Sequence, residues 1–373
     1  MAASAPLLTH ATRMLVSLLL TGSALQAIAS EPVTPIQVGT AVAKHGQVSR
    51  GEILIDAGSD SGYSIPVIVA NGERPGPTLA LIGGLHGAEF ASIVALQKLS
   101  TQIDASRLSG RVIIVPLVNV AAFDAVARHL NPVDGKNINR VFPGSVSGTQ
   151  SERAAYAVTT QVIDQANYVI DYHGGDIDED QHPYAYWIQT GIAQLDASEL
   201  DMLLAYGPDY IIKFAAAGLT VETAKLLPTQ AVARGKPTIT VDAGRAGTYT
   251  AADLATLIDG TFNVMASLEM LDRPVKAPKK PTYIERFIYV KSEGTGTFYP
   301  LAARGQHVRK GQKIGYVTDR YGMPSFDVVA PESAVVLYLN STPSAVQGEQ
   351  LFYLGVPAQG DATQRPAKFG GGT

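Results

Sequence analysis

The chain has 373 residues, of which 46% are hydrophobic and 17% charged, enough for a large buried core and a smaller second domain. Its formal net charge is −4 with both signs scattered along the sequence, which excludes the basic stripe that a nucleic-acid partner requires. The absence of cysteine excludes disulfides and thiolate chemistry.

The first 29 residues have the pattern of a secretory signal peptide. Arg13 precedes the apolar run MLVSLLLTGSALQAIA, which ends in Ala27-Ile28-Ala29, a small-x-small cleavage pattern. The run contains several polar residues and falls short of the roughly 20 apolar residues that a membrane span needs. We therefore expect cleavage near Ala29 and a secreted or periplasmic protein without a stable membrane span. The alternative is an anchoring helix.

Residues 30–271 alternate between strand-like and helix-like segments. Short aliphatic and β-branched runs predict buried strands at Pro77–Gly84, Arg111–Val120, Asn167–Gly175 and Pro237–Gly244. Apolar residues three and four apart predict helices at Glu89–Ser100, Ser151–Ala166 and Ala251–Leu271. Ser151 and Thr250 are the predicted N-caps. Together these segments predict an α/β domain with a mixed, largely parallel central sheet covered by helices.

The composition changes near Arg273. Residues 272–281, DRPVKAPKKP, are rich in proline and lysine and predict a linker. Residues 282–356 contain short strand-like runs separated by turn segments such as SEGTG and RYGMP, which predict a smaller all-β barrel or sandwich domain. Residues 357–373 have the composition of a disordered tail.

Three residues with metal-binding chemistry follow predicted strands. His86 and Glu89, in GGLHGAEF, come after one strand, and His173 ends another. Ligands of open α/β sheets bind outside the carboxyl ends of the strands, so we expect all three at one rim. Residues three apart on a helical turn are neighbours, and two histidines with one carboxylate form the ligand set of a hydrolytic zinc centre. The alternative is that His86 caps a turn and His173 is a hydrogen-bonded core histidine, but the glycines beside both favour the joint site.

The order of motifs resembles one enzyme family. GGLHGAEF is followed by NPVDGKNINRVFPG (Asn131–Gly144), by DYHGGD (Asp171–Asp176) and by a strand that ends in an acid before glycine. This order is similar to that of the succinylglutamate desuccinylase/aspartoacylase family, relatives of the zinc carboxypeptidases. The resemblance extends from about Ile36 to Leu354 and includes the C-terminal β-domain. Nucleophile-elbow, HExxH, P-loop and GxGxxG motifs are absent from the sequence.

The resemblance implies roles for single residues. His86, Glu89 and His173 match the zinc ligands, which implies one Zn²⁺ per chain. Asn139 and Arg140, in NINR, match the pair that holds a substrate carboxylate. A planar guanidinium suits this role because it binds both carboxylate oxygens at once.

Two further implied roles come with departures from the family pattern. Family members use an upstream arginine to polarise the scissile carbonyl; Arg128 is the candidate, but its spacing to Arg140 is longer than in some relatives, and His129 is the alternative. Relatives usually carry glutamate as the general base at the end of the last core strand, where this chain has Asp242. Asp242 is then a base with an adjusted backbone, a weakened base, or a sign of lost activity.

The resemblance implies a zinc-dependent amidohydrolase that acts on carbon–nitrogen bonds other than peptide bonds. We expect it to hydrolyse the amide of a small N-acylated amino acid or related compound, with zinc-bound water as the nucleophile. The substrate carries a carboxylate, and the C-terminal domain narrows the mouth of the site. A homo-oligomer is compatible with this interpretation. The alternatives are a zinc carboxypeptidase acting on peptide C-termini and a non-catalytic binding protein, the latter because Asp242 replaces the usual glutamate.

Overall fold

The computed structural model describes Met1 and residues 34–275 and 280–358. The rest of the predicted signal peptide, the centre of the predicted linker and most of the predicted tail lie outside the described residues. Residues 34–275 and 280–358 belong to one compact unit. Within these two ranges, no helix combines the length and apolarity needed to cross a membrane.

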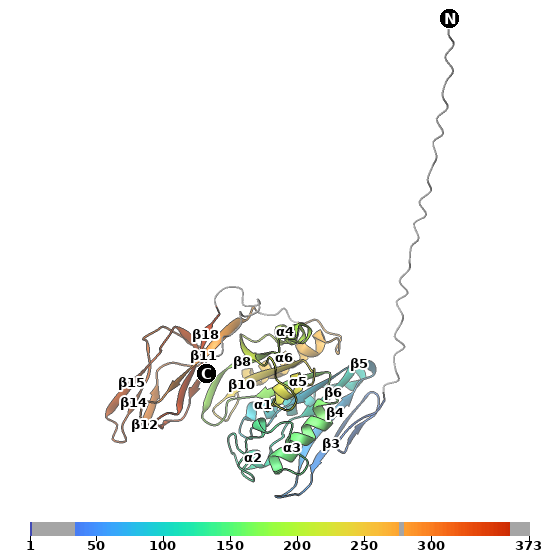
Figure 1. The fold of residues 1–373 in the computed structure, drawn as a ribbon, viewed down its shortest axis with the longest axis horizontal. Coiled ribbons are helices and arrows are strands. Elements are labelled where there is room, and N and C mark those ends of the chain that lie inside the picture. Colours follow the sequence, from blue (N-terminus) through green and yellow to red (C-terminus); the bar gives the residue numbers. More distant parts are fainter. Residues whose placement is uncertain (2–33, 276–279, 359–373) are drawn as a thin grey trace. The chain divides into compact units, whose positions relative to one another are not determined.

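A mixed 12-stranded sheet forms the centre of this unit (Figure 1). Its strands in the first part of the chain are β3 (Gln47–Ile55), β4 (Tyr63–Asn71), β5 (Arg74–Ile82), β6 (Ser109–Val115), β7 (Tyr168–His173), β8 (Glu179–Gln189), β9 (Tyr210–Ala215) and β10 (Thr238–Arg245). The order across this part is β9-β8-β10-β7-β5-β6-β4-β3. The pairs β10–β7, β7–β5 and β5–β6 are parallel, whereas β8 runs antiparallel to β10. The predicted mixed sheet is confirmed, with parallel pairs at its centre and antiparallel pairs where β4 joins β6 and β3.

Helices cover both faces of the sheet. One face packs against α1 (Phe90–Ser100), α4 (Ala193–Tyr206) and α6 (Ala251–Ser267), and the other against α3 (Gln150–Val158), the π-helix η3 (Thr159–Ile163) and α5 (Leu227–Ala233). The alternation of side chains along a strand divides each strand between the two cores. In β5, Leu79 and Leu81 join the first core, and Ala80 and Ile82 join the second.

The remaining short elements flank this sheet. They are β1 (Ile36–Val38), β2 (Ala41–Ala43), α2 (Val120–Asp124), and the 3-10 helices η1 (Ala105–Arg107) and η2 (Ile138–Arg140). The strands β1 and β2 pair with each other and pack into the second core.

One of the two predicted N-caps is confirmed. The Thr250 side chain accepts a hydrogen bond from the Asp253 amide at the start of α6. Ser151 is wrong as a cap, because α3 begins earlier, with Thr149 as the N-cap. The Glu152 carboxylate accepts hydrogen bonds from both the amide and the hydroxyl of Thr149, so the acid three residues on sets the start of the helix. Ser151 lies in the first turn and donates its hydroxyl to Asp134.

The C-terminal part is all-β, as predicted, and it takes part in two sheets. A four-stranded sheet has the order β15-β14-β12-β17, with β12 (Gly296–Pro300), β14 (Lys313–Thr318), β15 (Pro324–Val329) and β17 (Ser344–Ala345). Four other strands extend the central sheet: β11 (Thr282–Lys291), β13 (His307–Val308), β16 (Ala334–Asn340) and β18 (Gln350–Pro357).

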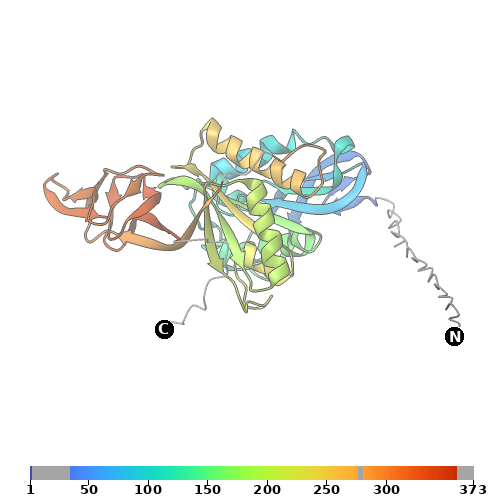
Figure 2. The same cartoon turned by 90° about the horizontal axis from the view of Figure 1, so that it is seen from above.

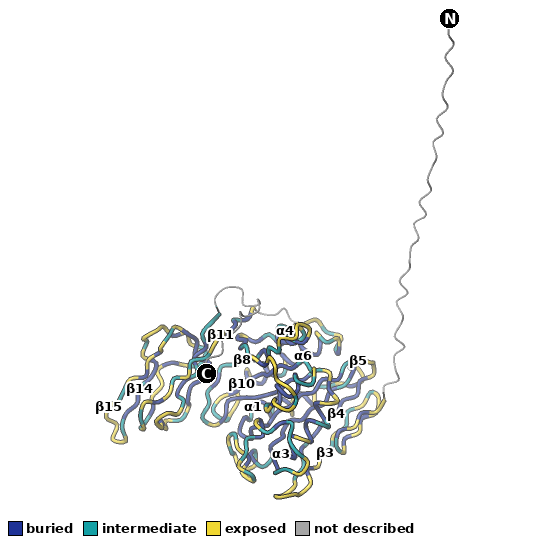
Figure 3. Tube along the Cα trace, in the orientation of Figure 1, coloured by how far each residue is buried: buried dark blue, intermediate teal, exposed yellow. Residues whose placement is uncertain are grey.

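Two strand pairs join this part to the central sheet. β11 pairs with β9, and the end of β16 pairs with the start of β8, so the orange and red strands of Figure 2 continue the green ones. Figure 3 shows the central strands buried and the outer strand β15 largely exposed. The domain boundaries at residues 271 and 282 stay a prediction.

Candidate functional site

The register of three neighbouring strands places His173, Asp242 and Tyr184 in one row. Asp242 of β10 lies beside His173 of β7 in the parallel pair and opposite Tyr184 of β8 in the antiparallel pair. Directly paired residues present their side chains on the same face of a sheet. The row therefore lies on the face that carries α3 and α5, opposite the face of α1 and α6.

A second row lies two residues away on the same face. Thr240 of β10 pairs with Asp171 on one side and with Tyr186 on the other. The Thr240 hydroxyl donates to an Asp171 oxygen at 3.4 Å. The two rows form the floor on which the site is built.

His86 and Glu89 reach this floor from the loop between β5 and α1. A side chain at Gly87 would lie 2.2 Å from the backbone of Ala122 and Phe123, so the close packing of this loop on α2 requires glycine. Glu89 is the N-cap of α1, and its amide donates to the His86 carbonyl at 3.5 Å. The two residues are neighbours as predicted, but across the turn that precedes the helix rather than within it.

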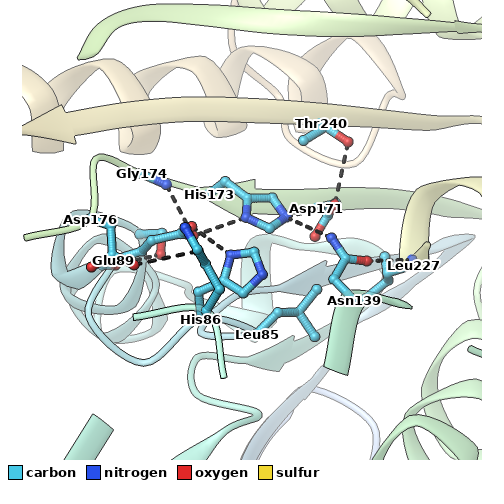
Figure 4. A network of polar contacts seen from close by, with 12 residues as sticks. Leu85, His86, Glu89, Asn139, Asp171, His173, Gly174, Asp176, Leu227 and Thr240 are labelled. Carbon is cyan, nitrogen blue, oxygen red and sulfur yellow. Dashed lines mark hydrogen bonds and ion pairs between the residues drawn. The ribbon is translucent and has the colours of Figure 1, made fainter. Parts of the chain in front are cut away.

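The three predicted metal ligands converge (Figure 4). Nδ1 of His86 lies 2.6 Å from Oε1 of Glu89, and Nδ1 of His173 lies 2.9 Å from Oε2 of the same carboxylate. One ligand atom from each of the three lies within 4.8 Å of the others, and all three residues are buried. They are close enough to share one metal ion.

The outer nitrogen of each histidine has an oxygen partner. Nε2 of His173 lies 3.2 Å from Asp171, and Nε2 of His86 lies 3.2 Å from the Asn137 side-chain oxygen. A hydrogen bond at the outer nitrogen fixes the ring and leaves the inner nitrogen as the ligand, an arrangement typical of metal-binding histidines. Both Nδ1 atoms are therefore directed at the place where Glu89 would share an ion.

The electrostatics of this cluster favour positive charge. Burial acts to raise the pKa of Glu89, but the neighbouring His86 and His173 outweigh it and lower that pKa overall. Burial acts to lower the pKa of His173, but Asp171 and Glu89 outweigh it and raise it well above its ordinary value. An arrangement that holds a buried carboxylate ionised between two basic rings suits a cation at its centre.

Asp242 lies beside the cluster with one oxygen unsatisfied. The residue is 8% exposed, and within the described chain its Oδ1 atom is buried without a hydrogen-bond partner. Burial raises the pKa of Asp242 to about 7, partly opposed by the nearby charge of His173. A buried carboxylate that takes up protons near neutral pH has the property expected of a general base.

A cavity of about 340 Å³ opens onto these residues. It is lined by His86, Glu89, Asn139, Arg140, Asp171, His173, Glu179, Gln181, Tyr184, Tyr186, Ile188, Phe214, Leu226, Pro228, Thr240, Asp242, Tyr289 and Tyr353. The lining combines the candidate metal ligands and carboxylates with an aromatic wall. Two of its tyrosines come from the C-terminal strands β11 and β18.

Asn139 and Arg140 reach the cavity from η2. Oδ1 of Asn139 accepts the Leu227 amide at 2.8 Å, which ties η2 to the start of α5, and Nδ2 lies 3.4 Å from Nε2 of His173. The Arg140 guanidinium donates to the Asn139 carbonyl at 2.7 Å. Among the described residues it forms no ion pair with a carboxylate, so the surface salt bridge that competes with a substrate role is not seen there.

The structure separates the two candidates for the carbonyl-polarising residue. Neither residue is among the described residues that line the cavity. Arg128 is half-exposed and pairs with Asp178 at 2.8 Å. The His129 ring lies 5.0 Å from the His86 ring, between Asp176 and Glu179. The structure thus brings His129, and not Arg128, next to the metal ligands; the role itself stays a prediction for both.

Sequence reasoning missed the residues that β8 contributes. Glu179, Gln181, Tyr184, Tyr186 and Ile188 all line the cavity. The alternation Tyr184, Tyr186, Ile188 is a strand signal visible in the sequence. Only the pairing of β8 with β10 shows that this alternating face meets the metal ligands.

Comparison with known proteins gives a consistent result. The profile of the Succinylglutamate desuccinylase/Aspartoacylase catalytic domain matches residues 75–268. The chain is 32% identical over 294 residues to the N-alpha-acetyl-L-2,4-diaminobutyric acid deacetylase of Halomonas elongata, covering 77% of this chain and 84% of that protein.

Solved structures agree with the sequence comparison. A succinylglutamate desuccinylase from Silicibacter sp. TM1040 is similar with a TM-score of 0.77 and 25% identity, covering 88% of this chain and 99% of that one. The product-bound ectoine utilization protein EutE (DoeB) of Ruegeria pomeroyi is similar with a TM-score of 0.76 and 26% identity, covering 87% and 99%. With its buried His-Glu-His site and these matches, the chain belongs to the succinylglutamate desuccinylase/aspartoacylase family of deacylases.

Proposed function

We propose that this protein is a zinc-dependent hydrolase that cleaves the amide bond of a small N-acylated amino acid or related compound. The observation that carries the proposal is the convergence of His86, Glu89, His173 and Asp242 on one cavity of about 340 Å³. Three protein ligands with an adjacent carboxylate base are the set that metal-assisted amide hydrolysis requires.

The ligands fit zinc by their chemistry. Two imidazole nitrogens and one carboxylate oxygen, each buried and already directed at a common point, match a catalytic zinc site with one position left open. When bound, zinc supplies Lewis acidity, which makes a water molecule nucleophilic near neutral pH. We propose one ion per chain.

The chain's own residues then handle the protons. The unpartnered Oδ1 atom of Asp242 takes a proton from the attacking water, and the same carboxyl group returns a proton to the nitrogen as the carbon–nitrogen bond breaks. The products are a carboxylic acid and a free amine, so one water is consumed for each bond cleaved. Arg140, which lines the same cavity, binds the carboxylate of the amino-acid part.

The substrate class follows from the cavity and from the relatives. The Halomonas elongata protein is named as a deacetylase of an acetylated diamino acid, and it is 32% identical to this chain. A cavity of about 340 Å³ lies near the lower limit of the pockets that hold small ligands. A small N-acylated amino acid is therefore the proposed substrate, rather than a long peptide.

The first prediction concerns the metal. Purified protein should contain one equivalent of zinc by elemental analysis, and His86→Ala and His173→Ala should each lose the metal and the hydrolytic activity together. His45→Ala is the matched control, because His45 is exposed and pairs with Glu73. If both site variants still bound one equivalent of zinc, His86 and His173 would not be the metal ligands.

The second prediction concerns the general base. Asp242→Asn should keep zinc but lose about 10² to 10⁴ in kcat, the range typical of general-base help. Asp242→Glu should retain partial activity or better, since glutamate is the usual family residue. Asp201→Asn, on the exposed surface of α4, is the control. If the Asp242→Asn variant keeps full turnover, Asp242 is not the general base.

The third prediction is that Arg140 recognises the substrate carboxylate. Arg140→Lys keeps the charge but loses two-pronged binding, so kcat/KM should fall by an amount equivalent to about 1.5 to 3 kcal/mol. Converting the substrate carboxylate to an amide should harm wild type far more than the variant. The measurement is a double cycle of kcat/KM over both enzymes and both substrates. If masking the substrate carboxylate lowers kcat/KM equally in wild type and in Arg140→Lys, Arg140 does not recognise that carboxylate.

The fourth prediction concerns export, which we propose from the N-terminal sequence alone. Arg13, the following apolar run and Ala27-Ile28-Ala29 should direct cleavage before Ser30 and release the protein to the periplasm or the medium. N-terminal sequencing of protein recovered from these fractions gives the mature start. A product that still begins near Met1, or that stays in the cytosol, contradicts export.

A further inference from the structure

The cavity has a polar end and an apolar end along β8. From the start of β8 toward its end, the residues that line the cavity are Glu179, Gln181, Tyr184, Tyr186 and Ile188. Side chains on one face of a strand advance by about 6.7 Å for every two residues, so Ile188 lies about 13 Å along the strand from Tyr184, in the row of the candidate base. The cavity therefore continues well beyond that row.

Residues from three elements form the apolar end. Phe214 of β9 is the direct neighbour of Ile188 in the parallel β8–β9 pair, and its ring centroid lies 6.5 Å from that of Tyr186. Val232 of α5 shares a buried cluster with Ile188, and the rings of Tyr186 and Phe214 pack against this cluster. The start of α5 contributes two further residues of the lining. We define the apolar subsite as Tyr186, Ile188, Phe214, Leu226 and Pro228.

The apolar subsite contains no charged side chain. Asp171, the carboxylate in the same row as Tyr186, belongs to β7. Neighbouring strands lie about 4.8 Å apart, so β7 is about 10 Å from β8 and about 14 Å from β9. The Asp171 carboxylate also contacts His173 and Thr240. An ammonium group in the apolar subsite would lose its hydration without meeting a carboxylate there, which is unfavourable.

The residue proposed to bind the substrate carboxylate lies next to the apolar subsite. Oδ1 of Asn139 accepts the amide of Leu227, which stands between Leu226 and Pro228 in the sequence. Arg140 follows Asn139 and lines the same cavity. The carboxylate-binding group and the apolar subsite therefore meet where η2 contacts the start of α5. A carboxylate and a side chain that branch from one α-carbon can reach both together.

We propose that the amino acid released by this enzyme has an apolar side chain of about the size of leucine or phenylalanine, and that the apolar subsite binds it. The inference rests on the proposed function, in which Asp242 is the general base and Arg140 binds the carboxylate. Burial of the substrate side chain favours binding because it removes apolar surface of both partners from water. This preference differs from that of a diamino acid deacetylase, the class named for the Halomonas elongata relative.

The test compares kcat/KM of the purified zinc-loaded protein on four substrates that share an acetyl group and a carboxylate. They are the N-acetyl derivatives of L-alanine, L-leucine and L-phenylalanine, and Nα-acetyl-L-2,4-diaminobutyrate. The leucine compound adds three carbon groups to the alanine compound and should be hydrolysed about 10- to 100-fold more efficiently, as should the phenylalanine compound. The charged diaminobutyrate compound should be at least about tenfold less efficient than the leucine compound.

Variants at Phe214 test the subsite directly. Phe214→Ala should lower the leucine-to-alanine ratio of kcat/KM about tenfold, because it removes one wall of the subsite. Phe214→Asp should place the diaminobutyrate compound above the leucine compound, since a carboxylate then meets the ammonium group. Phe326→Ala in β15 is the matched control: Phe326 is half-buried and is not among the described residues that line the cavity, so the wild-type ratios should persist. If the Phe214 variants fail to fold, Leu226→Ala should lower the same ratio.

The outcomes distinguish the inference from the proposed function. If the alanine or the diaminobutyrate compound is the best substrate, or if Phe214→Ala and Leu226→Ala both leave the leucine-to-alanine ratio unchanged, the inference is wrong and the deacylase function stands. More efficient hydrolysis of N-hexanoyl-L-alanine than of N-acetyl-L-leucine would assign the subsite to the acyl chain and would also overturn the inference. If the zinc-loaded protein hydrolyses none of these compounds, the proposed function itself is wrong.

Discussion

A slip of β10 by one residue against β7 would turn Asp242 toward the face covered by α1 and α6, because side chains alternate along a strand. The register between β7, β10 and β8 is therefore the constraint on which the site depends. It sets His173 beside Asp242, and Asp242 opposite Tyr184, without any long loop. The first core resists such a slip, since Ile239, Val241 and Ala243 would leave it and the polar side chains of Thr240 and Asp242 would enter it.

Two glycines allow the segments that carry the metal ligands to pack closely on their neighbours. At Gly175, a side chain would lie 2.2 Å from the Glu179 carbonyl, so the chain after His173 passes β8 at a distance that only glycine permits. Gly87 plays the same part against α2. Burying Glu89 is unfavourable unless the charge is compensated. Two histidines supply that compensation here, and a divalent cation fits the same place.

The sequence predicted those parts of the site that depend on local pattern. His86, Glu89 and His173 follow apolar runs and are flanked by glycine, and Thr250 caps α6, so short windows were sufficient. Ser151 failed as a cap because the decisive contact joins Thr149 to Glu152. The pairing of strands that are distant in sequence could not be predicted, because nothing local in β8 shows that Tyr184 lies opposite Asp242. The conformation of the loop around residues 128–136 likewise decides that His129, and not Arg128, lies next to His86.

The C-terminal part of the chain contacts the ends of β8 and β10, close to the candidate site. Arg304 donates to the Gln181 and Gly244 carbonyls and lies 3.5 Å from Asp253 at the start of α6. This one side chain thus ties the C-terminal part to the backbone two residues beyond Asp242. The same part places Tyr289 and Tyr353 in the cavity wall. The wall that these tyrosines form is therefore anchored close to the candidate base, so a change in the C-terminal strands would reach the cavity through Arg304 and the paired ends of β8 and β16.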